Sequence, residues 1–314
     1  MTLATPDLAP SRTASITIPP GLAIAEAMPD ILQPRKPSTG ILGFCRRNPA
    51  IAIGGGVLLI MLFAALLAPY LGTYDPTAIA PGRRTRVPSG VNWFGTDALG
   101  RDIYSRCIYG ARVSLIVGFG VAILSSVVGL AIGLVSGMVR ALDGLIMRAV
   151  DGMMSIPPIL LAVALMALTR GSVENVIIAI TLAQIPQVAR LVRGLVLSLR
   201  ELPYIDAAIA AGTRMPMLIL RHILPNTFAA MSVQATYICA SAMITESILS
   251  FIGAGIPPSV SSWGNIMAEG RALWQVKPFI ILFPAAFLSL TVLAVNLLGD
   301  GMRDLLDPRL AKRL

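Results

Sequence analysis

Long stretches without charge alternate along this sequence with short segments that hold most of the ionisable side chains. Beyond a proline-rich beginning, six stretches contain few or no charged residues. A helix needs about 20 mostly apolar residues to cross the hydrocarbon core of a bilayer, and it pairs its own backbone groups there. The pattern therefore predicts an all-α, polytopic membrane protein with six transmembrane helices, at about residues 50–70, 113–139, 149–168, 175–197, 229–252 and 279–299.

Composition supports a membrane protein and excludes several other classes. Of the 314 residues, 55% are hydrophobic and 13% are charged, whereas soluble domains average roughly 25% charged residues. The mean hydropathy is +0.77. One His and three Cys exclude a metal cluster of these residues and a disulfide framework. The net charge of +9 indicates basic residues that flank spans, because no basic patch with interleaved aromatic side chains points to a nucleic acid.

The positions of Lys and Arg predict the orientation. If the N-terminus is cytoplasmic, most of the 25 basic residues fall in segments on the inner side, in agreement with the positive-inside bias. The segment 72–112 is an exception, because its arginines then lie on the outer side. We expect a multi-pass protein of the cell inner membrane with both termini in the cytoplasm.

The same pattern divides the chain into five parts. Seven prolines and the lack of a sustained apolar period predict a disordered cytoplasmic tail at 1–43 rather than a signal peptide. The remaining parts are the first transmembrane helix and its exit (44–76), an extracytoplasmic loop with an interfacial helix (77–110), a core of five transmembrane helices (111–303) and a cytoplasmic C-terminal tail (304–314).

Within the core, the inner loop 201–226 predicts a compact knob of two short helices. Pro203 suits the first turn of a helix, the alanines that follow favour helix, and Gly212 can end it with a positive φ. A second short helix is expected over residues 214–223, before Pro225. A knob of this kind suits insertion into a groove on a soluble partner.

This loop resembles the EAA loop of ABC-importer permeases. The matching residues are Asp206-Ala207-Ala208, then Gly212, then His222-Ile223-Leu224-Pro225. Two positions depart from the family pattern, since Asp206 replaces a glutamate and His222 replaces an isoleucine. Further segments resemble, in the same order, the second (C-type) permease subunit of dipeptide and oligopeptide importers; they lie at 47–50, 68–76, 94–102, 109–115, 249–255, 262–264 and 296–309.

The resemblance implies a type I ABC-importer permease fold and a set of partners. In membrane lipid, this chain would form a heterodimer with a second permease subunit, and two ATP-binding subunits and an extracytoplasmic solute-binding protein would complete the importer. The implied cargo is di- or oligopeptides, with nickel complexes, glutathione or opines as alternatives, because selectivity resides largely in the binding protein. The resemblance also implies an ATPase-coupling role for Asp206, Ala207, Ala208, Gly212, Arg214, His222, Leu224 and Pro225.

We expect no catalysis by this chain. No phosphate-binding loop of the form G-x-x-x-x-G-K-[ST] occurs. No cofactor is therefore expected here, and the resemblance implies that partner subunits use ATP and Mg. Two other classes remain open. An ion-coupled secondary transporter would need charged relays inside the membrane, and a receptor or scaffold would not require a coupling knob.

Glu246 is the only acid deep in a predicted span. A charge at the centre of a span costs roughly 2.5–3.5 kcal/mol on insertion scales. A hydrogen-bonded role in the interior is therefore favoured over contact with cargo in the pathway. Near the inner surface, Arg148 and Asp151 are spaced to form an ion pair at a helix end.

The outer side offers further candidates. Thr96 and Asp97 are expected to cap a helix that runs to Gly110, with Arg101 and Asp102 as surface pairs. An apolar stripe on this helix would suit the membrane interface, and two tryptophans would be anchors of the aromatic belt. The stripe consists of Leu99, Ile103 and Cys107, the anchors are Trp263 and Trp274, and the candidate contacts for a binding protein are Asp97, Arg101 and Trp263.

Overall fold

The computed structural model describes residues 41–71 and 74–306. The chain divides into two units, Met1–Phe44 and Cys45–Leu314, and the features described below lie in the second. The predicted N-terminal tail falls outside the described residues, apart from the beginning of helix α1 (Ile41–Arg47). Most of the predicted C-terminal tail also falls outside them, although α12 continues to Leu306.

Regular structure in the described residues is helical, apart from one isolated bridge between Thr96 and Asp102. Two short 3-10 helices cover Pro81–Arg83 and Arg271–Leu273, and a π-helical segment covers Ile219–Ile223. The remaining α-helices are α2 (Pro49–Leu66), α3 (Ala68–Leu71), α4 (Ile103–Met138), α5 (Arg140–Met154), α6 (Pro158–Ala167), α7 (Val173–Arg200), α8 (Pro203–Ala210), α9 (Met215–Leu218), α10 (Leu224–Phe251), α11 (Trp263–Gly270) and α12 (Phe279–Leu306).

Five helical stretches are long and apolar enough to cross a membrane: α2, α4, α7, the continuous stretch Met215–Phe251, and α12. They coincide with five of the six predicted spans. The remaining one, predicted at 149–168, is not a single straight helix. It is the pair α5 and α6, bent by 84° at a short break, and the count reaches six only if this pair is one span.

Two consecutive prolines, Pro157 and Pro158, explain the break between α5 and α6. A residue that precedes proline is driven out of the helical region, and Pro157 has φ −54° and ψ 132°, which is extended backbone. Pro158 then occupies the first turn of α6, where its missing N–H costs nothing.

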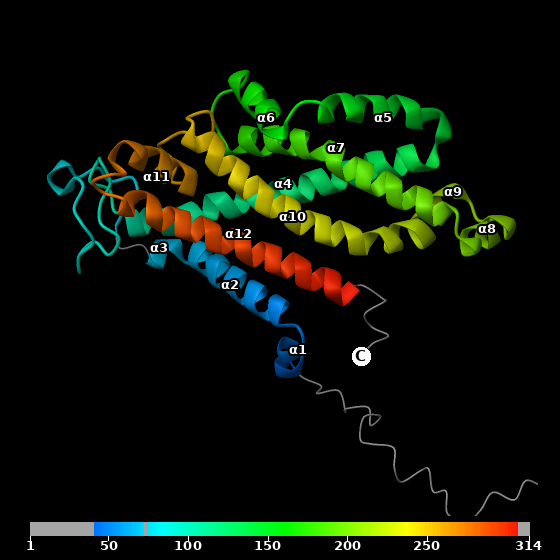
Figure 1. The fold of residues 1–314 in the computed structure, drawn as a ribbon, viewed down its shortest axis with the longest axis horizontal. Coiled ribbons are helices and arrows are strands. Elements are labelled where there is room, and N and C mark those ends of the chain that lie inside the picture. Colours follow the sequence, from blue (N-terminus) through cyan, green and yellow to red (C-terminus); the bar gives the residue numbers. More distant parts are fainter. Residues whose placement is uncertain (1–40, 72–73, 307–314) are drawn as a thin grey trace, which may run out of the picture. The chain divides into compact units, whose positions relative to one another are not determined.

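The close contact of α4 with α7 organises the helices. Gly129, Gly133 and Gly137 are spaced by four along one face of α4, and small residues in this pattern let a neighbouring helix approach closely. A Cβ atom on any of them would lie 2.5–2.7 Å from a valine side chain of α7, namely Val188, Val192 or Val196. On the other side, α10 packs against both α4 and α12, and α2 packs against α12, so that α2, α12 and α10 run side by side (Figure 1).

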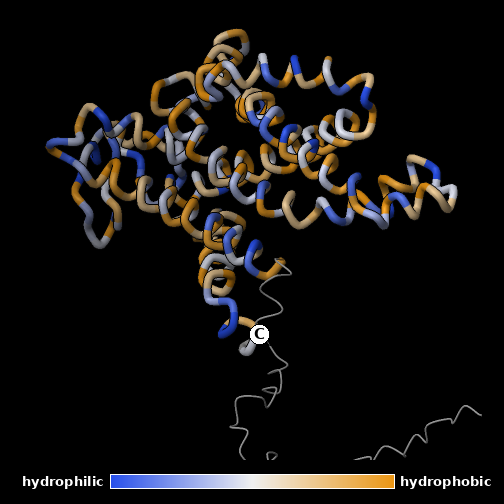
Figure 2. Tube along the Cα trace, turned by 45° about the vertical axis from the view of Figure 1, so that its right-hand side comes forward, coloured by the Kyte–Doolittle hydropathy of each residue, from blue (hydrophilic) through white to orange (hydrophobic). Residues whose placement is uncertain are grey.

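Many large apolar side chains of these helices are exposed. Figure 2 shows the hydrophobic residues as orange segments along the helices. In the 18-residue apolar segment of α2, only 17% is buried inside the protein, and in that of α12 only 28% is buried. In water such faces would be an aggregation hazard. They suit a lipid environment and contacts with other membrane subunits.

The outer loop between α3 and α4 departs from the prediction. The expected helix from Thr96 to Gly110 is wrong, because α4 begins at Ile103, where the Asp102 carboxylate accepts a hydrogen bond from the Ser105 N–H at 2.8 Å. No separate interfacial helix forms in the described part of 77–110. Gly95 and Gly100 explain the difference, since both have positive φ, and a Cβ on Gly100 would lie 1.9 Å from the Ala80 carbonyl oxygen.

Candidate functional site

The inner loop begins with α8, which ends as predicted in a glycine turn. Pro203 lies in the first turn, and Gly212 has a φ of +79°. The turn is closed by hydrogen bonds from the Gly212 N–H to the Ile209 carbonyl (2.9 Å) and from the Thr213 N–H to the Ala208 carbonyl (3.0 Å). Only glycine adopts this conformation without strain. Gly212 therefore sets the direction in which the chain leaves α8.

The second half of the loop differs from the predicted separate helix. The short helix α9 continues through the π-helical segment into α10, so that Met215–Phe251 is one helical stretch. Pro225 does not end this stretch, because it lies in the first turn of α10, and a π-helical turn shifts the hydrogen bonds that a proline would otherwise break. The loop thus ends in a helical extension of a membrane span.

The outward face of the loop is apolar as well as charged. Ile209, Met215, Met217 and Leu220 are each more than half exposed. Ile205, Leu218 and Ile223 are buried and fix the loop on the protein. An exposed apolar patch at an inner loop marks an interaction surface. These four side chains were not among the residues predicted for the loop, and the Met-Pro-Met run at 215–217 was the signal that could have found them.

Of the residues implied by the resemblance, Asp206, Ala207, Gly212, Arg214 and Pro225 are exposed, and Ala208, His222 and Leu224 are half-buried. The backbone carbonyl of His222 accepts a hydrogen bond from the Asn226 side chain at 2.6 Å. The same amide donates to the Tyr204 hydroxyl at 3.4 Å, so Asn226 links α8 to the start of α10. This link joins the two halves of the loop.

Near the start of α4, a cluster of four charges replaces the predicted surface pairs; three of them are buried and the fourth, Glu269, is partly exposed. Asp97 and Arg106 are fully buried, and Arg101 is 7% exposed. Arg106 donates to Asp97 and to Glu269, each at 2.6 Å, and the Arg101 Nε donates to Asp97 at 2.7 Å. Arg101 also pairs with Glu269. Because α11 covers this cluster, Asp97 and Arg101 are not surface contacts for a binding protein, and that assignment is wrong.

Trp263 is likewise buried and is no membrane-interface anchor or partner contact. Its indole N–H donates to the Cys107 carbonyl at 3.0 Å, and Gly110 makes room for its ring. Trp274, by contrast, is 58% exposed. The predicted interfacial stripe is also wrong in part, since Ile103 and Cys107 are buried in a small core with Ile266 and Ile280.

Glu246 lies in the interior of the protein and accepts hydrogen bonds, as predicted for an acid within a span. It is fully buried, and the Ser250 hydroxyl donates to it at 2.8 Å. The hydroxyls of Ser114 and Ser247 lie at 3.5 Å. The hydroxyls come from both α4 and α10, so Glu246 contributes to helix packing.

Ion pairs between α5 and α7 correct a further prediction. Asp151 pairs with Arg190 and not with Arg148. One turn of α7 later, Arg193 makes two hydrogen bonds to Asp143, at 2.5 and 2.6 Å. The amphipathic α5 thus supplies the acids that neutralise two of the three arginines of α7.

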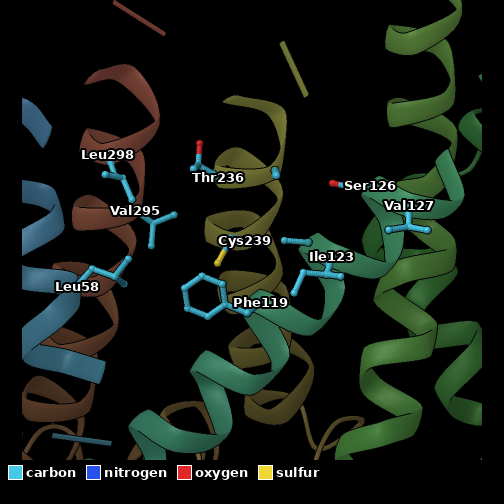
Figure 3. Close-up of a pocket in the computed structure, with 11 residues that line it drawn as sticks. Leu58, Phe119, Ile123, Ser126, Val127, Thr236, Cys239, Val295 and Leu298 are labelled. Atoms are coloured by element: carbon cyan, nitrogen blue, oxygen red, sulfur yellow. The ribbon is translucent and has the colours of Figure 1, made fainter. Parts of the chain in front are cut away.

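An apolar cavity of about 330 Å³ lies between α2, α4, α10 and α12. Leu58, Phe119, Cys239 and Val295, one from each helix, point into it (Figure 3). A second cavity of about 390 Å³ follows along α4 and α10 and shares Ser126, Val127 and Ala235 with the first. Together they form a largely apolar groove on the side of the helices.

Comparisons with known proteins agree with this architecture. The family described as binding-protein-dependent transport system inner membrane component matches residues 125–312. The N-terminal TM domain of oligopeptide transport permease C matches residues 45–88.

Two curated relatives and one solved structure are similar over most of their own length. The probable peptide ABC transporter permease protein y4tQ of Sinorhizobium fredii is 48% identical over 89% of this chain and 96% of that protein. The glutathione transport system permease protein GsiD of Pectobacterium atrosepticum is 39% identical over 85% and 89%. A chain of the inward-facing MetNI methionine ABC transporter covers 63% of this chain and 94% of its own length, with a TM-score of 0.52 and 20% identity. At 20% identity, the similarity to the MetNI chain shows the fold alone.

Proposed function

The chain belongs to the inner-membrane permeases of binding-protein-dependent ABC importers, and from this premise we propose that its cargo is peptides. It has the type I importer permease fold, and ATP hydrolysis in such importers lies in partner subunits. The peptide cargo is supported by the relatives named for peptides and glutathione. Glutathione is itself a small peptide, so both names describe one chemical class.

Such a permease works with a second permease, ATPase subunits and a binding protein in general. The identity and number of these partner subunits belong to the proposal. This chain is the C-type partner of a permease heterodimer, two ATP-binding subunits bind ATP and Mg, and a solute-binding protein delivers the peptide from the outer side. The match of residues 45–88 to the N-terminal domain of permease C supports this position in the assembly.

Both termini are proposed to be cytoplasmic, with the loop 201–226 on the inner side. The outer arginines were the exception to the positive-inside bias. Arg101 and Arg106 are neutralised by Asp97 and Glu269, so they add no net positive charge to the outer surface. The other four arginines of the segment 72–112 remain an exception to the positive-inside bias.

The coupling role of the loop 201–226 rests on one observation. Its second half is continuous with α10, and its first half is linked to the same helix through Asn226. A shift of the loop by a partner subunit must therefore move a span. The apolar side chains Met215, Met217 and Leu220 supply the docking area, and Asp206 and Arg214 supply charges at its edge.

Reconstitution of the complete importer in vesicles tests the proposed function. We expect uptake of a labelled tripeptide that requires internal ATP and the binding protein and that is unaffected by dissipation of ion gradients. Uptake that follows an ion gradient without ATP would refute the importer assignment. Uptake of sugars or inorganic anions in place of peptides would refute the cargo.

A further inference from the structure

A cavity at the outer end of α4 lies apart from the coupling loop and from the buried charge cluster. Its volume is about 430 Å³, within the usual range of small-molecule sites. Tyr109 and Arg112 of α4 form one wall, and Ser259 and Ser261, from the segment between α10 and α11, form another. Pro76 and Thr77 of the outer loop close it.

Arg112 brings a positive charge to this cavity that no acidic side chain among the described residues pairs with. Its side chain is exposed, and it has no ion pair or hydrogen bond with any residue that the structure describes. Arg101 and Arg106, on the same end of the protein, are held by two acids. The described lining of the cavity contains no acidic side chain. An unpaired guanidinium in a concave site attracts an anion, and it binds a carboxylate through two parallel hydrogen bonds.

The walls of the cavity are held in place without a ligand. The Asn265 side chain donates to the carbonyls of Pro257 and Val260, each at 3.0 Å, and so fixes the serine-bearing segment. Thr77 donates through its N–H and its hydroxyl to Asp75, at 2.8 and 2.7 Å, and these bonds lower the pKa of that carboxyl. A site that is preformed in this way loses little ordering entropy when it binds.

Below Arg112, the same face of α4 is apolar and exposed. Ile116, Phe119, Ile123 and Val127 follow at positions i+4, i+7, i+11 and i+15 from Arg112, which is one stripe of a helix. The lower three residues line the apolar cavity of Figure 3. The arginine thus stands at the outer end of an apolar groove.

We infer that Arg112, with the hydroxyls of Tyr109, Ser259 and Ser261, forms an outer subsite for the C-terminal carboxylate of the transported peptide. This inference rests on the proposed peptide cargo. Side chains vary among peptides, and apolar walls discriminate weakly between them, whereas every unmodified linear peptide ends in a carboxylate. A single cation at the mouth orients many different cargoes, and the groove accepts their side chains.

The test compares a tripeptide that has a free C-terminus with the same tripeptide as its C-terminal amide. Uptake is measured in vesicles with the complete importer, and binding of both peptides to the binding protein is measured separately so that uptake is compared at saturation. The variants are Arg112→Gln and Arg112→Lys. Arg84→Gln is the matched control, because Arg84 is also an exposed arginine of the outer side and does not line the cavity.

We expect Arg112→Gln to lower uptake of the free peptide by about tenfold, as for loss of a charged hydrogen-bonded pair, and to leave the amide within about twofold of wild type. The preference of the importer for the free peptide should therefore disappear. Arg112→Lys should keep part of the preference, because it keeps the charge and loses the bidentate geometry. Arg84→Gln should transport both peptides as wild type does.

Equal losses of both peptides in Arg112→Gln would overturn the inference, since a structural role does not distinguish acid from amide. A lipid phosphate is the other anion that Arg112 could bind. Repeating the assay in phosphatidylcholine vesicles, with and without phosphatidylglycerol, distinguishes it from the peptide carboxylate. A loss that depends on the lipid and not on the peptide end would assign Arg112 to a lipid phosphate and overturn the inference. If wild type transports neither peptide, the proposed cargo itself falls, and the inference falls with it.

Discussion

The charge cluster near the start of α4 and the loop 201–226 differ in how their charged side chains are surrounded. At the outer end, Asp97, Arg101, Arg106 and Glu269 neutralise one another inside the protein. At the inner end, Asp206 and Arg214 are exposed, as are the apolar side chains around them. The difference indicates that the outer end is stabilised within this chain, whereas the inner loop offers its surface to another subunit.

The largest effect should come from breaking the outer cluster. Asp97→Asn would leave two buried arginines with only Glu269 as an acidic partner, and removal of one member of a buried ion pair costs about 3–5 kcal/mol. We expect a large loss of thermal stability of the detergent-solubilised chain, measured by its unfolding midpoint. Arg214→Gln at the inner loop should leave the midpoint unchanged. If both variants unfold alike, the contrast between the two ends does not hold.

The next effect concerns assembly rather than stability. Leu220→Glu places a charge in the exposed apolar patch of the loop 201–226, where Leu220 is 62% exposed. Burying that charge against a partner should weaken the contact by about 2 kcal/mol or more. The free energy of unfolding of the chain itself should change by no more than about 0.5 kcal/mol, because the position is exposed. Co-purification of the ATP-binding subunits measures the result.

Val276→Glu is the matched control for Leu220→Glu. Val276 is 74% exposed and lies between α11 and α12, on the proposed outer side. It should assemble as wild type does. Normal recovery of the ATP-binding subunits with Leu220→Glu would contradict a docking role for the patch.

Two glycines with the same left-handed backbone conformation separate mechanical coupling from stability. Gly212 at the inner loop has φ +79°, and Gly253 at the outer end of α10 has φ +84°; neither has a neighbour within 4 Å of its Cβ position among the described residues. A valine at either site should cost about 1–2 kcal/mol of folding free energy. Only Gly212→Val should also reduce uptake per ATP hydrolysed, by roughly tenfold.

Parallel assays of uptake and ATP hydrolysis on reconstituted Gly212→Val and Gly253→Val decide this point. Equal ratios of uptake to hydrolysis in the two variants would mean that the loop is a connector. A lower ratio in Gly212→Val alone supports the proposed coupling.

Local rules made the first half of the inner loop predictable, whereas the outer cluster depends on long-range contacts. Pro203 and Gly212 determine a helix start and a turn from neighbouring residues alone, and lipid imposes the span lengths. Asp97 and Arg101 stand four apart and resemble a surface pair of a helix, yet Glu269, the second acid that pairs with Arg101, lies far along the chain. Only the packing of α11 on α4 reveals it. The break at Pro157-Pro158 could have been predicted from the two prolines. Gly95 and Gly100 likewise indicated that residues 96–102 would not form the expected outer helix.

The smallest effect should come from the exposed ion pair between α5 and α7. Asp151→Asn removes the same chemical group as Asp97→Asn, but the side chains of Asp151 and Arg190 are 58% and 51% exposed. Solvent screens such a pair, and its contribution is about 0–1 kcal/mol. We expect the unfolding midpoint of Asp151→Asn to stay close to that of wild type and to change little with added salt. A loss as large as that of Asp97→Asn would show that burial does not determine which charges stabilise this protein, and the distinction between its two ends would then fail.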